Sequence, residues 1–121
     1  MRKHILAIAA LAGVTLSGAA YAHATLKAEN PAPNAVVSNS LKEVRLTFSE
    51  AVTPAFSGIK LTDLTGKAIA TGAPHLDAKN QKALVVPLKS TLAAGKYQLA
   101  WYAVSDDAHR VTGKYSFSVK R

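Results

Sequence analysis

Apolar and polar residues alternate along most of the sequence after residue 22, and this period of two constrains the fold more than any other feature. The clearest segments are 44–48 (VRLTF), 97–101 (YQLAW) and 115–119 (YSFSV). Such alternation puts the apolar side chains on one face of an extended strand. Further strands are predicted at residues 24–28, 57–63, 67–70 and 83–88, separated by turn-forming residues around Pro31, Gly66, Pro74, Gly95 and Gly113.

About seven short strands in roughly 100 residues predict an all-β fold, an antiparallel Greek-key sandwich or small barrel. After residue 22, apolar residues never follow helical spacing over three turns, and only Ser38–Leu41 suggests a short helical turn. The chain contains no cysteine, so no disulfide stabilises this fold. We expect the aromatic residues at alternating strand positions to form much of the core: Phe48, Tyr97, Trp101, Tyr115 and Phe117.

The first 22 residues have the pattern of a secretory signal peptide. Arg2 and Lys3 precede an apolar run from Ile5 to Leu16, and Ala20-Tyr21-Ala22 then supplies an A-x-A cleavage pattern. The apolar run is shorter than the roughly 20 residues of a membrane-spanning helix. Cleavage after Ala22 would leave a domain of residues 23–121 that begins with His23, and the export route predicts a periplasmic location.

Basic residues are spread evenly along the predicted domain. Cleavage removes two of the 15 Lys and Arg residues and none of the seven Asp and Glu residues, which leaves a net charge of about +6. No dense basic run interleaved with aromatic residues marks a nucleic-acid-binding patch. We therefore expect no nucleic-acid partner, and interpret the lysines as solvated faces and protected strand edges, with weak attraction to anionic lipid or an acidic partner as the other interpretation.

A carboxylate and an imidazole stand two residues apart at Asp107 and His109, in the segment SDDAHR. In extended backbone, residues i and i+2 point to the same face, so both groups could reach one ion. The triplet D-x-H is common, however, and alone it is a weak metal-binding signal.

His23 strengthens that signal because cleavage would give it a free α-amine. The amine and the imidazole Nδ1 of one residue can close a six-membered chelate ring around a metal. With the His109 imidazole and the Asp107 carboxylate, the donor set would be three nitrogens and one oxygen, which favours Cu(II) among divalent metals. The alternative is that His23 follows the cleavage site by accident.

The other polar residues indicate less. Glu50 follows the strand 44–48. It could orient the amine or a ligand imidazole without binding the metal itself, or simply be solvated. Asp106 could replace Asp107 or be a turn residue, while His75 lies in a proline-containing loop where a weak site with Asp77 is possible. No Ser/His/Asp nucleophile arrangement, glycine-rich phosphate loop or paired carboxylates suggest an enzyme.

Taken together, these segments resemble the CopC family of periplasmic copper-binding proteins. The resemblance rests on His23 at the predicted cleavage site and on the segments NPAPNAVV, VRLTFSEAV, FSGIKL and YQLAWYAVSDDAHRVTGKYSFSV. It implies a seven-stranded Greek-key barrel with cupredoxin- or immunoglobulin-like topology. It also implies one Cu(II) per mature chain bound by His23, Asp107 and His109, with Glu50 close by, and a partner of the CopD type in the inner membrane.

The sequence departs from the family in three places. Some relatives bind Cu(I) in a methionine-rich loop, but Met1 is the only methionine here and is lost with the predicted signal peptide. Soft thioether ligands suit Cu(I), so we expect a Cu(II)-only protein that acts as a carrier or buffer in copper homeostasis or resistance. Ala108 stands where glycine is frequent, and Arg110 where proline is frequent.

Two alternatives belong to other functional classes. A copper-dependent oxidative enzyme of the lytic polysaccharide monooxygenase type also uses an N-terminal histidine chelate and a second histidine. About 99 residues leave little room for a polysaccharide-binding face, and Asp107 would occupy the position that oxygen chemistry needs open. The other alternative is a metal-free immunoglobulin-like interaction domain.

Overall fold

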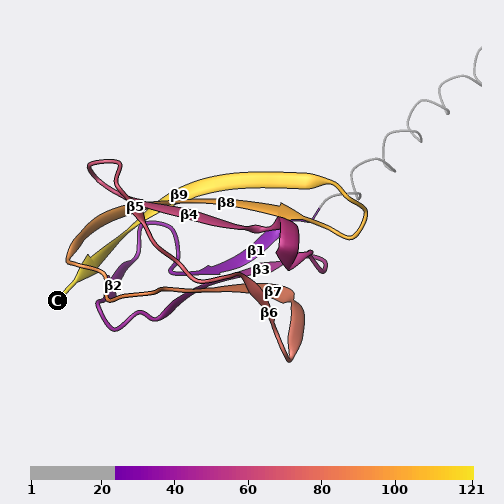
Figure 1. Cartoon of the computed structure of the whole chain (residues 1–121), viewed down its shortest axis with the longest axis horizontal. Helices are drawn as coiled ribbons and strands as arrows, with labels where there is room; N and C mark the ends of the chain where they lie inside the picture. The colour runs from indigo at the N-terminus through magenta and orange to yellow at the C-terminus, as the bar shows by residue number, and fades with distance from the viewer. Residues whose placement is uncertain (1–23) are drawn as a thin grey trace, which may run out of the picture.

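The computed structural model describes residues 24–121, which form two β-sheets packed face to face (Figure 1). The predicted signal peptide and His23 lie outside the described residues. Within residues 24–121 there are nine strands and one 3-10 helix: β1 (Leu26–Asn30), β2 (Val36–Ser38), β3 (Glu43–Phe48), η2 (Pro54–Phe56), β4 (Gly58–Asp63), β5 (Ala68–Ile69), β6 (His75–Asp77), β7 (Asn80–Pro87), β8 (Gly95–Val104) and β9 (Arg110–Lys120).

The strand order is β1-β3-β7-β6 in one sheet and β2-β9-β8-β4-β5 in the other. The chain changes sheet at β1–β2, β2–β3, β3–β4, β5–β6 and β7–β8. This confirms the predicted all-β sandwich. All neighbouring strands are antiparallel except β2, which pairs with β9 in parallel.

Each predicted strand is present, and the structure adds β2 and β6. Both have only three residues, too few to show an alternating pattern. His75 therefore lies in an edge strand and not in the loop predicted for it. The segment expected to form a short helical turn, Ser38–Leu41, forms a single hydrogen-bonded turn in which Leu41 N–H donates to the Ser38 carbonyl at 3.2 Å.

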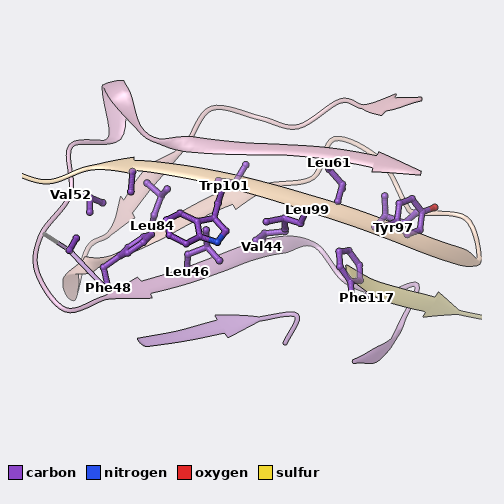
Figure 2. Close-up of a cluster of buried hydrophobic side chains, with 14 of the residues drawn as sticks. Val44, Leu46, Phe48, Val52, Leu61, Leu84, Tyr97, Leu99, Trp101 and Phe117 are labelled. Atoms are coloured by element: carbon purple, nitrogen blue, oxygen red, sulfur yellow. The ribbon is translucent and has the colours of Figure 1, made fainter. Parts of the chain in front are cut away.

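The core lies between the two sheets and is built from the inward positions of the alternating strands (Figure 2). Phe48 and Trp101 meet edge to face with ring centroids 5.5 Å apart, and Tyr97 stacks on Phe117 at 5.8 Å. Tyr115 packs at the margin of the core, where its hydroxyl donates to the Pro31 carbonyl at 2.7 Å. The predicted aromatic core is thus confirmed.

One end of the sandwich gathers three chain segments that are far apart in the sequence. Leu26 pairs with Phe48, so the start of β1 and the end of β3 lie together. Val52, in the crossing from β3 to β4, forms an isolated bridge with Ser105, just after β8. The first described residues and the β8–β9 loop therefore lie at the same end (Figure 1). No helix within residues 24–121 is long and apolar enough to span a membrane.

Candidate metal centre

The β8–β9 loop brings the side chains of Asp107 and His109 into contact. His109 Nδ1 lies 3.1 Å from Asp107 Oδ2. The His109 side chain is 50% exposed and the Asp107 side chain 40% exposed, so an ion from solvent can reach both. The structure thus brings together two of the three predicted ligands.

The contact arises from a tight turn and not from strand alternation as the sequence suggested. Ala108 N–H donates to the Ser105 carbonyl at 2.9 Å, and Ser105 N–H donates to the His109 carbonyl at 3.1 Å. Ala108 has a φ of 70°, in the left-handed region that favours glycine. This conformation accounts for the frequent glycine at this position in the family. Alanine adopts it here at a structural cost, and both donor groups stay in place.

Asp107 is held by neighbouring donors in its ionised form. The Ser105 hydroxyl donates to Oδ1, and His109 N–H donates to the same oxygen at 3.3 Å. These bonds, the one from Ser105 most of all, lower the pKa of Asp107 below its usual value. Ser105 itself is buried and is fixed through its bridge to Val52, so the carboxylate is anchored to the body of the fold.

The start of the described chain is anchored close to this loop. Ala24 is buried in the core, and Thr25 N–H donates to Ser49 Oγ while Ser49 N–H donates to the Thr25 carbonyl, each at 2.8 Å. Glu50 follows Ser49 and makes no hydrogen bond or ion pair with any residue that the structure describes. Glu50 thus lies in the segment between Ser49, which is hydrogen-bonded to Thr25, and Val52, which bridges Ser105.

The Asp107–His109 pair fits two adjacent ligands of a tetragonal metal. Ligands bound at about 2.0 Å and at right angles lie about 2.8 Å apart, close to the 3.1 Å between these donor atoms. Within residues 24–121, no group of three or more His, Cys, Asp or Glu side chains could hold a metal. The third predicted ligand, His23, lies outside the described residues.

The carboxylate of the weaker predicted site around His75 already has other partners. Asp77 pairs with Arg45 and accepts a hydrogen bond from Lys79 N–H at 2.9 Å. Asp106 is exposed and has no hydrogen-bond or ion-pair partner among the residues described, so it does not take the place of Asp107.

Sequence reasoning missed Ser105, which positions the carboxylate, and Arg110, whose guanidinium carbon lies 4.9 Å from the ring centroid of Tyr102. A signal for Ser105 was available: it continues the inward positions of Ala103 and Trp101, where a polar residue needs a partner.

Comparisons with known proteins give consistent matches. The family model described as CopC domain matches residues 26–120. Protein YobA of Escherichia coli K12 is 40% identical over 118 residues, which are 98% of this chain and 94% of that protein. Copper resistance protein C of Escherichia coli is 36% identical over 126 aligned positions, which cover 99% of this chain and 98% of that protein.

Copper transport protein CutJ of Bacillus subtilis is 30% identical over 106 residues, which are 88% of this chain but only 20% of that protein. Among solved structures, CopC from Methylosinus trichosporium OB3b has a TM-score of 0.74 at 34% identity, covering 81% of this chain and 94% of that one. PcoC, a methionine-rich copper resistance protein from Escherichia coli, has a TM-score of 0.73 at 36% identity, with 82% and 100% covered.

Proposed function

The chain belongs to the CopC family, and from this premise we propose that it is a periplasmic carrier or buffer for Cu(II) in copper homeostasis. Relatives that match nearly the whole chain are named copper resistance proteins. The observation that carries the proposal is the exposed Asp107–His109 pair, with Nδ1 and Oδ2 3.1 Å apart in an anchored loop.

We assign the Cu(II) ligands to the amine and imidazole of His23, the carboxylate of Asp107 and the imidazole of His109. His23 is bonded to the buried Ala24. The next residue, Thr25, is hydrogen-bonded to Ser49, close in sequence to Val52, which bridges Ser105 of the β8–β9 loop. In this proposal Glu50, which has no described partner, accepts a hydrogen bond from the new amine. Removal of the signal peptide would then create the site, with one copper per mature chain.

The oxidation state follows from the donors that the chain offers. Residues 23–121 contain no methionine and no cysteine, so soft ligands for Cu(I) are absent from the sequence. A structural relative is titled a methionine-rich copper resistance protein. This chain would differ from that relative in binding Cu(II) alone.

A partner that moves copper across a membrane fits this role. In the Bacillus relative, named a copper transport protein, the stretch similar to this chain makes up one fifth of the length. We propose that the separate domain exchanges copper with a CopD-type inner-membrane protein, and that the domain itself is not an enzyme.

Electron paramagnetic resonance of the Cu(II)-loaded protein tests the ligand set. Protein that begins at His23 should show three nitrogen donors and one bound copper. The matched control retains Ala22 ahead of His23, which converts the amine to an amide and should weaken binding by orders of magnitude. Equal affinity of the two forms would refute the amine ligand.

The enzyme alternative has its own readout. Copper-loaded protein would have to consume reductant together with oxygen or peroxide faster when a polysaccharide is supplied. We expect no such dependence, and a substrate-dependent turnover would replace the carrier proposal with an oxidative one.

A further inference from the structure

The fold gathers cations that the sequence spreads evenly. On β4, β8 and β9, the outward positions alternate with the buried ones. They carry five cations: Lys60, Lys96, Arg110, Lys114 and Lys120. None of the seven acidic residues in the chain occupies an outward position of these strands, whereas the strands of the other sheet include Glu29, Glu43 and Asp77.

Three of these cations surround a hollow on the outer face of the sheet. The hollow has a volume of about 590 Å³ and is open to solvent. Lys60 pairs with Ala100, and Ala100 pairs with Lys114, so two exposed lysines flank a small residue in one row across three strands. Neither lysine belongs to an ion pair among the residues described.

The third cation is held in place by an aromatic ring. The Tyr102 ring lies over Gly58, where an added Cβ would lie 2.8 Å from the phenol oxygen, so a larger residue at this position would force the ring to shift. Arg110 stacks on this ring with 4.9 Å between its guanidinium carbon and the centroid. The stacking fixes a planar, two-pronged donor suited to carboxylates.

The spacing of these groups matches an extended acidic segment. Tyr102 lies two residues after Ala100 along β8, so the backbone of the residue on which Arg110 stacks is about 6.6 Å from the lysine row. In an extended peptide, side chains at i and i+2 point to one face with the same separation. One carboxylate would bind between Lys60 and Lys114, and the next would bind Arg110.

We propose that this face docks an extended acidic segment of a partner protein, with carboxylates at alternate positions. The inference rests on the proposed carrier function for its purpose, because Arg110 directly follows His109 and a docked segment would lie beside the copper loop. A partner bound there stands where copper would enter or leave.

A protein segment fits this face better than a membrane does. The exposed large hydrophobic residues Val36, Phe56 and Leu64 do not line the hollow. Trp101 does line it, but this core residue is only 9% exposed and does not project far enough to insert among lipid tails. Lipid headgroups also lack a fixed spacing that would match the two-residue offset along β8 between the lysine row and Tyr102.

Binding of two labelled peptides to copper-free protein, measured by fluorescence anisotropy, tests the proposal. One peptide alternates threonine and glutamate; its isomer has the same composition with the glutamates adjacent. We expect the alternating peptide to bind more tightly. The double variant Lys60→Gln with Lys114→Gln should weaken binding of the alternating peptide about tenfold. The matched control, Lys27→Gln with Lys82→Gln on the other sheet, removes the same charge and should leave that binding unchanged.

Several results would overturn the proposal. Equal losses in the two double variants would mean that net charge alone attracts the peptide, and equal affinity for the isomers would remove the spacing argument. Binding to phosphatidylglycerol vesicles but to neither peptide would assign the face to a membrane. Copper affinity is measured in the same samples: if Lys60→Gln with Lys114→Gln loses the peptide and keeps copper, the docking face is independent of the metal site.

Discussion

Asp107 has two neighbours that favour its charged form, the Ser105 hydroxyl and the His109 ring. Asp106 is the adjacent residue and carries the same charge without any described partner. We expect Asp107→Asn to weaken Cu(II) binding by about 10- to 100-fold, because the amide is a poorer donor than the carboxylate. Asp106→Asn is the matched control, and titration with a competing chelator measures both. Equal effects would show that only local charge matters.

Ser105 acts on the metal site through Asp107 and not as a ligand. Its hydroxyl is buried and donates to Oδ1 of the carboxylate. Loss of such a supporting hydrogen bond commonly lowers metal affinity about tenfold. We therefore expect Ser105→Ala to weaken Cu(II) binding by about that factor while the nitrogen pattern of the paramagnetic spectrum is retained. A changed number of nitrogen donors would contradict this positioning role.

At this scale the sequence predicts the proximity of two candidate donors but not the residues that support them. The D-x-H spacing of Asp107 and His109 identified the pair, although the turn at Ala108, and not extended backbone, brings the side chains together. Ser105 and the stacking of Arg110 on Tyr102 depend on which strands become neighbours. Local sequence does not contain that information.

At the scale of elements, the β8–β9 hairpin carries both the core and the candidate site. Gly113 pairs directly with Trp101, and an added Cβ would lie 2.6 Å from Cζ2 and 2.7 Å from Nε1 of the indole. The ring cannot easily move away, because its other contacts include Phe48 in the core.

We accordingly expect Gly113→Ala to lower the free energy of unfolding by about 1–3 kcal/mol, the usual cost of overpacking. Urea denaturation followed by tryptophan fluorescence measures this loss, since Trp101 is the only tryptophan. Thr112→Ala, at the neighbouring exposed position, should change stability by less than about 0.5 kcal/mol. A neutral Gly113→Ala variant would mean that the indole has room to shift.

The alternating pattern is clearest in the long strands. Residues 97–101 and 115–119 alternate over enough positions to identify β8 and β9, and each of these strands extends beyond the predicted segment at both ends. β2 and β6 form only because a long partner strand is already in place, β9 for the first and β7 for the second. Their short segments therefore carry no pattern of their own.

For the whole molecule, two carboxylates outside the metal site link stability to acid pH. The pKa of Asp63 is lowered, chiefly by the Thr65 hydroxyl and then by Lys67 N–H, and that of Asp77 by Lys79 N–H and then Arg45. A carboxylate whose pKa is lower in the folded state stabilises the fold at higher pH. That contribution is complete above the unfolded value near 3.8 and is lost as pH falls through the folded value.

We expect the copper-free protein to hold its stability down to about pH 4 and to lose it below that point. The combined variant Asp63→Asn with Asp77→Asn should show a flatter decline below pH 4, because it lacks both titrating groups. Thermal melts followed by circular dichroism between pH 2 and pH 6 measure the slopes. Parallel curves for the two proteins would place the acid sensitivity elsewhere.

Copper binding adds a second pH dependence to the stability of the fold, which acts between about pH 5 and pH 8 and not in acid. A ligand that binds only the folded state at 100 times its Kd adds about 2.7 kcal/mol, which is about 10–20 °C in Tm for a domain of this size. Protons compete with Cu(II) for amine and imidazole nitrogens, so this gain should shrink as pH falls from about 8 to 5. The form that retains Ala22 should gain little at any pH. A shift in Tm that is independent of pH, or equal in both forms, would exclude nitrogen ligands that begin with the amine of His23.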